Sequence, residues 1–497
     1  MIVMTKRHIL LSALAAAATL LLTGCNDFLF VKPTNRVALS SFSDVKAFLG
    51  GHLASYIGEG DQSYLASMSG PNIFYFGENT QDYLGFFYSD DFDAMRYPDN
   101  YMVYDPIVLY NALNWKEQTW PEDIWTAYYT NIGFYNTVLN ELERFPSDNE
   151  AENQQVSGEA RVLRAWNFFN AVKLFSPYHN DELGLPFNAE ADEVGTYDRR
   201  RQTQTENFAF ITSELEAVLA YDAEPRDGYN IFYDKRLISG ILAQVYFWKA
   251  GSGAGAEGDY QKAIDYAKSV LSQGVSFEQV QRTPPVTGEF GVYKNTGYSA
   301  FTAVYYDYMR NWNMMGVPMY GGGYYQYASE SLFALFTPED KRTALFFEPT
   351  DPGAIIKHLP AARMLGYQVD FCTGAEMQLI IAESYARMGR DAEAEAALAA
   401  FTAARYDGYT ADPSKSLLDR ILDERRKEFC FEWSMRWNDL ARLQPAWSRP
   451  AVDKIYDTGE YSEYTLEEGD YRYCLPIPQN AELSENKIAQ NPGWGAL

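Results

Sequence analysis

The sequence has 497 residues, enough to bury a large hydrophobic core, and its 67 acidic residues outnumber 41 lysines and arginines. A formal net charge of −26 repels phosphate backbones, which excludes nucleic acid as a partner. Aromatic residues make up 16% of the chain and tyrosine is the commonest of them, which suits surfaces that are both apolar and hydrogen-bonding.

The first 25 residues have the pattern of a lipoprotein signal. Lys6 and Arg7 precede an apolar run over 9–22, which is short for a bilayer span of ~20 residues and typical of a secretory signal. The small pair Thr23-Gly24 directly before Cys25 resembles a bacterial lipobox, in which the cysteine is lipidated and becomes the first residue. We therefore expect a signal peptide over 1–24 and a mature protein anchored to a membrane outside the cytoplasm through Cys25.

Helical periodicity dominates the mature chain. Helices are predicted from 41–43 to about 56, around 124–139 and 160–174, and over 205–219, 235–250, 260–271, 375–388, 391–405 and 417–443. Gly274 is a suitable C-terminal stop for the helix over 260–271.

The last predicted helix has a marked apolar face. Phe429, Trp433, Trp437 and Leu440 recur every three to four residues, which predicts a buried stripe. Glu432 and Arg436 are predicted to form an i,i+4 ion pair on the opposite face.

Two helix pairs resemble tetratricopeptide repeats, because small residues that let helices approach closely alternate with aromatic ones. The matching positions are Ala243, Tyr246, Ala263 and Val270 in the earlier pair, and Ala382, Tyr385, Gly389, Ala394 and Phe401 in the later one. The earlier pair has an insertion over 251–258 that formally contains a GxGxxG pattern. Since a helix and not a strand precedes it, we interpret it as an inter-helix loop rather than a dinucleotide site.

Two long segments, about 58–118 and 275–373, lack a regular period, and long ordered loops are usually functional. Between Tyr293 and Tyr327, eleven residues are aromatic and glycines interrupt them. Aromatic rings that reach the surface in such a stretch pack on the C–H faces of sugars, and tyrosine hydroxyls bond to sugar hydroxyls.

Trp312 is the expected stacking residue of this platform, because the amides of Asn311 and Asn313 beside it both donate and accept hydrogen bonds. Trp115, beside Asn114, is expected to be its counterpart in the first irregular segment. Four further candidates for the ligand site are chosen only because of their position in the two irregular segments: Tyr306, Tyr308, Tyr320 and Asp82.

No familiar catalytic motif is present. HExxH, GxSxG and Walker A patterns are missing from the sequence, so we expect no catalytic residue, no metal and no cofactor. A pair of carboxylates for glycoside hydrolysis is not excluded, because the two members of such a pair come together in the folded structure and need not be close in the sequence. The acidic stretch over 90–93 is interpreted as a loop rather than a calcium site.

The cysteines leave two alternatives. Cys372, Cys430 and Cys474 remain after lipidation of Cys25, with no CxxC spacing. They fit either one disulfide or three buried thiols.

Short motifs are spread over the whole mature length. In chain order they are Cys25-Asn26-Asp27-Phe28-Leu29; Gly158-Glu159-Ala160-Arg161 with Arg164-Ala165; Gly184-Leu185-Pro186; Glu424-Arg425-Arg426 with Phe431-Glu432 and Arg436-Trp437-Asn438-Asp439-Leu440; Leu475-Pro476-Ile477-Pro478; and Gln490-Asn491-Pro492-Gly493-Trp494. In this order and spacing they resemble the SusD/RagB family of outer-membrane lipoproteins from Bacteroidetes. The irregular segments carry no motif of that family.

The resemblance implies a mostly α-helical fold in one SusD-like domain over 25–497. About four tetratricopeptide helix pairs, over about 122–273 and 375–443, would form a scaffold beneath a large loop-rich ligand-binding face. It further implies non-catalytic glycan binding for nutrient uptake at the cell surface, as in a starch utilization system, and delivery to a SusC-like TonB-dependent outer-membrane transporter. A RagB-type peptide-binding lipoprotein and, less favoured, a secreted glycoside hydrolase are the alternatives.

Overall fold

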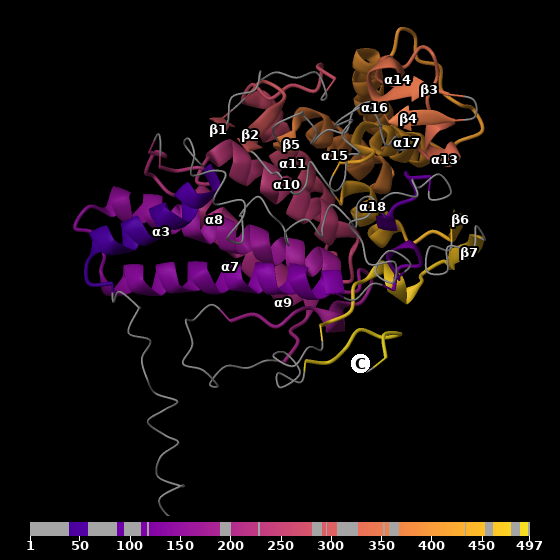
Figure 1. Cartoon of the computed structure of the whole chain (residues 1–497). Helices are drawn as coiled ribbons and strands as arrows, with labels where there is room; N and C mark the ends of the chain where they lie inside the picture. Colours follow the sequence, from indigo (N-terminus) through magenta and orange to yellow (C-terminus); the bar gives the residue numbers. More distant parts are fainter. Residues whose placement is uncertain are drawn as a thin grey trace, which may run out of the picture.

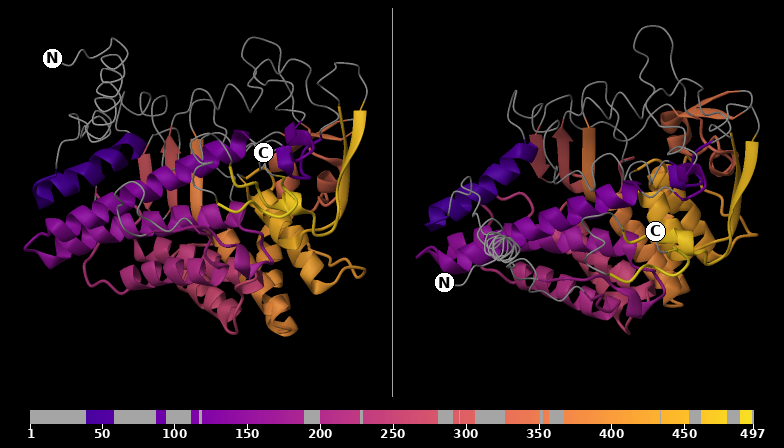
Figure 2. Two further views of the ribbon diagram at one scale, coloured as in Figure 1. Left: turned by 90° about the horizontal axis from the view of Figure 1, so that it is seen from below. Right: turned by 60° about the horizontal axis from the view of Figure 1, so that its bottom comes forward.

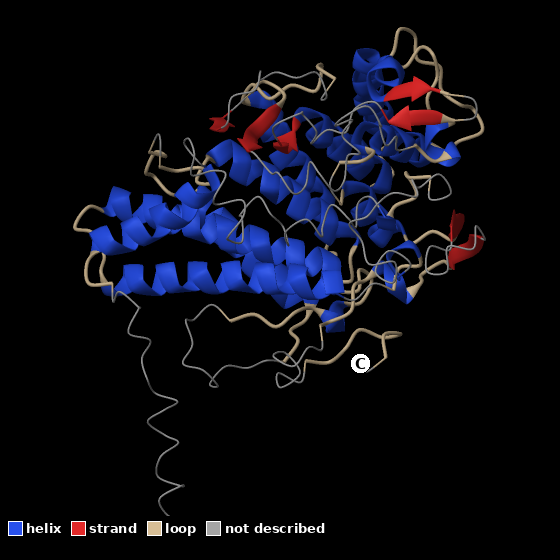
Figure 3. Ribbon diagram, in the orientation of Figure 1, coloured by secondary structure: helices blue, strands red, loops and turns tan. Residues whose placement is uncertain are grey.

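The computed structural model describes residues 39–57, 87–93, 111–116, 119–188, 200–226, 229–280, 291–294, 296–305, 327–350, 353–356, 367–432, 434–452, 461–478 and 488–495. Within these ranges the protein is mostly helical, as predicted, and three small groups of strands flank the helices (Figures 1 and 3). None of the helices in these ranges combines the length and the apolar character that crossing a bilayer requires.

The helices pack in succession along the chain. They are α3 (Phe42–Ile57), α7 (Thr119–Arg144), α8 (Glu150–Phe175), α9 (Gln204–Leu219), α10 (Lys235–Gly251), α11 (Asp259–Ser272), α15 (Gly374–Arg387), α16 (Asp391–Arg405), α17 (Leu417–Phe429) and α18 (Met435–Leu443). Each helix from α7 to α10 contacts the next, and α15 contacts both α11 and α16. The earlier and later helices therefore form one continuous scaffold (Figure 1).

The small residues of the predicted repeats lie at helix contacts. Ala243 and Ala263 are fully buried where α10 packs on α11, and Ala382 and Ala394 are fully buried where α15 packs on α16. Gly389, in the turn between α15 and α16, has φ +69°, a conformation that glycine adopts without steric cost.

The loop over 251–258 connects α10 to α11, as predicted. It is docked on the segment after α8: the Gly253 N–H donates to the Tyr178 carbonyl at 2.8 Å. A Cβ atom at Gly253 would lie 2.4 Å from the Asp181 nitrogen, so this position requires glycine. The glycines serve a close backbone approach, and the preceding element is a helix, which removes the dinucleotide interpretation.

The expectation that 275–373 lacks strands is wrong. β1 (Gly291–Lys294), β2 (Ser299–Tyr305) and β5 (Tyr367–Thr373) form an antiparallel sheet in the order β1-β2-β5. Figure 2 shows the three strands side by side along the helical scaffold. Phe301 lies opposite Phe371 in the register, and Phe371 also packs against Trp166 of α8 and Phe232. Burial of these rings against the helices stabilises the sheet. The alternating pattern of its strands is hard to recognise in the sequence because glycines interrupt the segment.

The remaining elements are short. They are η3 (Asp181–Leu183), α13 (Glu330–Phe333), α14 (Lys341–Phe346), β3 (Phe347–Pro349), β4 (Ala354–Ile356), β6 (Trp447–Val452), β7 (Tyr461–Leu466) and η4 (Tyr471–Tyr473). β3 pairs with β4 and β6 pairs with β7, both antiparallel. A large core runs through the helical scaffold and the first sheet, and a smaller one lies beneath the β3–β4 hairpin.

The prediction of one helix over 417–443 is wrong, because α17 ends at Phe429 and α18 begins at Met435. Phe431 has φ +62°, which no helix residue adopts. Phe429, Trp437 and Leu440 are buried, as the apolar stripe predicted. Trp433 lies outside the described residues.

The predicted pair between Glu432 and Arg436 is also wrong. Glu432 stands in the turn between the two helices and is buried. Arg436 instead donates from Nε to Asp90 at 2.6 Å. The i,i+4 geometry that the pair needs is lost where the helix breaks.

The Gly158–Arg161 motif on α8 holds the segment before α10. The Glu159 carboxylate accepts hydrogen bonds from the backbone N–H groups of Ile231, Phe232 and Tyr233 at 2.8 to 3.0 Å. A Cβ atom at Gly158 would lie 2.7 Å from the Tyr233 ring. This motif is therefore structural, since it shapes a turn in the core.

The C-terminal motifs are fastened to the end of α8. The Leu475 N–H donates to the Leu174 carbonyl at 2.9 Å, and Asn491 Nδ2 donates to the Phe175 carbonyl at 2.9 Å. Arg201 Nη1 donates to Asn491 Oδ1 at 2.7 Å. These bonds satisfy carbonyl groups that a helix C-terminus otherwise leaves without partners.

The structure decides between the two alternatives for the cysteines, because Cys372, Cys430 and Cys474 are all buried thiols and none of the three is in a disulfide. Burial raises the pKa of the Cys372 thiol well above its usual range and that of Cys474 to about 12. The Cys372 side chain fills the space beside Gly240 of α10, where a Cβ atom would lie 2.5 Å from Sγ.

Candidate functional site

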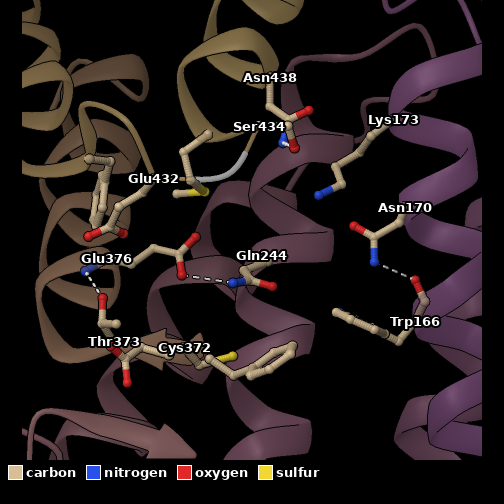
Figure 4. Close-up of a pocket in the computed structure, with 14 residues that line it drawn as sticks. Trp166, Asn170, Lys173, Gln244, Cys372, Thr373, Glu376, Glu432, Ser434 and Asn438 are labelled. Atoms are coloured by element: carbon tan, nitrogen blue, oxygen red, sulfur yellow. Dashed lines mark hydrogen bonds between the residues drawn. The ribbon is translucent and has the colours of Figure 1, made fainter. Parts of the chain in front are cut away.

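A polar pocket of about 100 Å³ lies where α8, α10, β5 and α15 meet the turn between α17 and α18 (Figure 4). Its lining combines ionisable groups, amides and apolar side chains: Trp166, Asn170, Lys173, Gln244, Asp370, Phe371, Cys372, Thr373, Glu376, Phe429, Glu432, Ser434, Met435 and Asn438. We call this the helix-junction pocket.

Lys173 is the cation of the helix-junction pocket. It lies on the same face of α8 as Trp166 and Asn170, and its ammonium group lies over the Phe169 ring at 4.9 Å. Figure 4 shows the side chain reaching from α8 toward the centre of the pocket. Burial lowers the pKa of Lys173 to about 8, and the Glu376 carboxylate opposes that shift.

Glu376 faces Lys173 from the first turn of α15. Thr373 caps this helix by accepting a hydrogen bond from the Glu376 N–H at 3.1 Å, which fixes the start of α15 directly after β5. Gln244 Nε2 on α10 donates to Glu376 Oε2 at 2.7 Å. Burial raises the pKa of the Glu376 carboxyl, although Arg425 and the Gln244 hydrogen bond oppose the shift.

Two amide oxygens point into the pocket in Figure 4. Asn170 Nδ2 donates to the Trp166 carbonyl at 2.9 Å, and Gln244 Nε2 donates to Glu376, so each amide has a defined orientation with its oxygen toward the pocket. On the opposite side, Asn438 Nδ2 donates to Ser434 Oγ at 3.1 Å. These bonds hold the amides from three separate helices.

Ion pairs hold α15, α17 and α18 together beside the pocket. Arg425 Nε donates to both carboxylate oxygens of Asp439 at 2.9 and 3.0 Å. Arg442 donates to Asp439 from Nε at 2.9 Å and to Glu383 from Nη2 at 2.9 Å. The opposite charges are matched within the network, so it positions the helices and leaves the pocket-lining groups available.

Trp115 does not fulfil the prediction that it offers an exposed stacking face. Its ring is fully buried, its Nε1 donates to the Tyr88 carbonyl at 2.9 Å, and it packs edge-on against Trp447 at 5.0 Å. The guanidinium groups of Arg449 and Arg472 lie over the ring at 4.6 and 5.6 Å. Trp115 is a core residue.

Asn114 is buried as well, with 5% of its surface exposed, and its carbonyl accepts from Arg472 Nη1 at 3.3 Å. The other predicted site residues lie outside the described residues: Asp82, Tyr306, Tyr308, Asn311, Trp312, Asn313 and Tyr320, together with the lipidation residue Cys25.

The acidic stretch over 90–93 forms ion pairs. Asp90 bonds to Arg436, and Asp91 Oδ1 accepts from Arg426 Nε at 2.9 Å. Within the described ranges, no cluster of three or more histidine, cysteine, aspartate or glutamate side chains is arranged to hold a metal ion.

Sequence reasoning missed the helix-junction pocket, since its residues come from four separate stretches of the sequence. One signal was present in the sequence. Trp166, Asn170 and Lys173 are spaced i, i+4 and i+7, which places a lysine on the same face as core residues of a largely buried helix. A lysine in that position needs a polar environment, and the pocket supplies one.

Two family models match the sequence. A model described as starch-binding and associating with the outer membrane matches residues 72–246, and a model described as the SusD family matches residues 374–494. The helix-junction pocket lies where these two segments meet, because α8 and α10 belong to the first and α15 and α18 to the second.

Solved structures share the fold over nearly the whole chain. A putative sugar binding protein from Bacteroides vulgatus ATCC 8482 is 18% identical with a TM-score of 0.67, over 93% of this chain and 100% of its own. A SusD superfamily protein from Bacteroides thetaiotaomicron VPI-5482 is 21% identical with a TM-score of 0.66, over 91% and 100%. A laminarin binding SusD-like protein is 18% identical with a TM-score of 0.62, over 92% and 100%. A search of curated proteins gave no significant match in sequence.

Proposed function

Because this chain belongs to the SusD/RagB family, we propose that it captures oligosaccharide at the cell surface and delivers it to a SusC-like TonB-dependent transporter. The family binds carbohydrate and associates with the outer membrane. One observation carries the proposal: the model described as starch-binding and outer-membrane-associated matches 72–246, which includes most of the first irregular segment and α7 to α9. Binding without turnover follows from the generally non-catalytic character of SusD-like proteins.

The ligand platform of the proposal is the loop-rich face with Trp312 as its stacking residue. Asn311 and Asn313 would bond to sugar hydroxyls, and Tyr306, Tyr308, Tyr320 and Asp82 complete the set. Trp115 and Asn114 are not retained, since both are buried in the core.

The membrane attachment in the proposal rests on the sequence before Cys25. Residues 1–24 would be removed as a signal peptide, and 25–497 would form one SusD-like domain held by lipid on Cys25. Cys25→Ala should abolish acyl labelling and leave the protein released or unprocessed in membrane fractionation. Unchanged labelling and fractionation would contradict the anchor.

Affinity electrophoresis of the full chain, purified in a detergent without sugar, tests ligand capture. Gels would contain starch, laminarin or other polysaccharides, with bovine serum albumin as the non-binding standard. We expect retardation by at least one glycan and no release of reducing sugar. Reducing-sugar release proportional to protein would favour the hydrolase, and binding of basic peptides but no glycan would favour the RagB-type alternative.

Delivery to a transporter is tested separately. Pull-down from native membranes in mild detergent should recover a TonB-dependent barrel with the protein. Recovery of the protein alone would count against the partner.

A further inference from the structure

The helix-junction pocket contains polar groups whose hydrogen-bonding capacity is unused. The Lys173 ammonium donates to no acceptor among the described residues, and the side-chain oxygens of Asn170 and Gln244 accept from none of them. Asn438 Oδ1 is buried at the same site and has no hydrogen-bond partner. A buried polar atom without a partner is destabilising, so Asn438 Oδ1 requires a water or a ligand, and the other three groups are open to the same occupant.

The sign of the charges limits what the pocket can bind. The carboxylates of Asp370, Glu376 and Glu432 line the pocket and repel an anion, whereas Lys173 repels a cation. A neutral group that both donates and accepts is compatible with one ammonium donor and several amide acceptors. Hydroxyl groups have that character.

The size of the pocket limits the ligand further. Its volume of about 100 Å³ is smaller than the ~150 Å³ of a cavity that holds one unsubstituted six-membered ring, so the pocket does not enclose a whole sugar ring. Because the pocket is partly open, the rest of a larger ligand would lie outside it. The apolar lining, which includes Trp166, Phe371 and Met435, suits the C–H groups that accompany adjacent hydroxyls.

We infer that the helix-junction pocket binds adjacent hydroxyl groups, presented by a small free polyol or by the edge of one terminal sugar unit. Lys173 is the hydrogen-bond donor of this site, and the oxygens of Asn170 and Gln244 are its acceptors. The site lies in the scaffold and differs from the loop platform around Trp312. The sugar-unit form of the inference rests on the proposed function, whereas the free-polyol form does not.

Protection of Lys173 from acetylation tests the inference on the unmodified protein. The full chain in sugar-free detergent would receive short pulses of acetic anhydride with glycerol, D-glucose, D-mannose or D-galactose present or absent. Mass spectrometry then gives the rate at each lysine. Lys262 on α11 is the control outside the pocket: its ammonium group lies over the Tyr246 ring at 4.5 Å and donates to the Tyr246 hydroxyl at 3.0 Å.

We expect at least one of the four compounds to slow acetylation of Lys173 at least threefold while the rate at Lys262 is unchanged. Equal rates at Lys173 with and without all four compounds would overturn the inference. Slowing of both lysines to the same degree would also overturn it, since that is a solvent effect.

The variants Lys173→Met and Lys262→Met provide a second measurement. Calorimetric titration with the protecting compound should show at least tenfold weaker binding for Lys173→Met and unchanged binding for Lys262→Met. Unchanged binding by a folded Lys173→Met would overturn the role of Lys173. If Lys173→Met does not fold, the labelling of the unmodified protein decides alone.

Electrophoresis in gels that contain polysaccharide distinguishes the two possible sources of the hydroxyl groups. Weaker retardation of Lys173→Met would assign the pocket to a terminal sugar unit, and unchanged retardation would assign it to a free polyol. The proposed function can fail independently: no retardation of the unmodified protein by any glycan, with Lys173 still protected by glycerol, would leave only the polyol site. If glycans retard the unmodified protein but no compound protects Lys173, the proposed glycan capture would stand and the inference about the helix-junction pocket would be overturned.

Discussion

Asp90 accepts two hydrogen bonds from Arg436, at 2.6 Å from Nε and 2.7 Å from Nη2, although 346 positions separate the two residues. Arg426 of α17 adds a bond from Nη2 to the Asp90 carbonyl at 2.8 Å. Burial of Asp90 opposes ionisation, but Arg436 and Arg426 outweigh it and lower the pKa of that carboxyl to about 2. The first irregular segment is therefore fixed to the last helices by charge at this point.

Asp90→Asn should destabilise the protein, since it leaves two arginines without their shared carboxylate. We expect a loss on the order of 3 kcal/mol in the free energy of unfolding, measured by urea denaturation. Glu393→Gln is the control, because its ion pair with Arg390 is exposed to solvent and should contribute little to stability. Equal losses in the two variants would show that the Asp90 pair is only a surface contact.

His52 should make stability depend on pH. Its ring stacks on Phe134 at 3.8 Å, and burial lowers its pKa to about 4, against ~6.5 in the unfolded chain. The unfolded chain therefore binds more protons between these values, and stability falls as the pH drops from about 6.5 to 4. The contribution is roughly 2 kcal/mol after allowance for the partial exposure of the ring. Unfolding of His52→Phe, which preserves the stacking, should show a smaller fall across this window; identical slopes would contradict the assignment.

Trp115→Ala should affect stability and not ligand capture. Removal of a fully buried tryptophan costs ~3–5 kcal/mol, and here two stacked arginines lose their ring as well. Trp115→Phe keeps a ring but removes the bond to the Tyr88 carbonyl, so it should cost less. A drop in melting temperature is the readout, and a stable Trp115→Ala variant with weakened glycan binding would return this residue to the ligand site.

Trp312→Ala should show the opposite behaviour if the proposed platform is correct. A ring face that covers roughly 80 Å² of a sugar contributes about 2 kcal/mol at ~25 cal/mol per Å². Glycan affinity should therefore fall about thirtyfold in electrophoresis with little change in melting temperature. Phe48→Ala, a partly exposed ring on α3, is the control that should leave affinity unchanged. A destabilised Trp312→Ala variant that binds normally when folded would remove Trp312 from the platform.

The helices could be predicted from the sequence because their periodicity and end signals are local. The sequence placed the ends of α9, α10 and α11 within one or two residues, and Gly274 has the positive φ that its position as a stop predicted. The break between α17 and α18 could not be predicted in this way. It depends on Phe431 and on the distant partner Asp90, which attracts Arg436 away from Glu432.

The sheet and the pocket were missed for a different reason. In the sequence of β5, Tyr367, Val369 and Phe371 alternate with polar residues. A pattern of only seven residues is too short to predict a strand when its partner strand is not known. The pocket has no local pattern, because Lys173, Gln244 and Glu376 come together only after three helices have packed. Trp115 looked exposed in an aperiodic segment, and only tertiary contacts with Arg449 and Trp447 bury it.

The hydrogen bonds between the C-terminal motifs and the end of α8 affect the order in which the chain folds. The carbonyl of Phe175 accepts from Arg201 Nη2 at 3.4 Å and, more closely, from Asn491, which lies 316 positions later. Since the Leu174 carbonyl also accepts from Leu475, the end of α8 lacks some of its hydrogen bonds until nearly the last residue is available. Contacts of such long range slow folding and prolong the exposure of apolar surface. If the chain is exported from its N-terminus, as the proposed function requires, we expect it to need protection by chaperones until its final residues are available. A premature stop shortly before Leu475 would leave a molecule that has its helices but is a substrate for proteolysis.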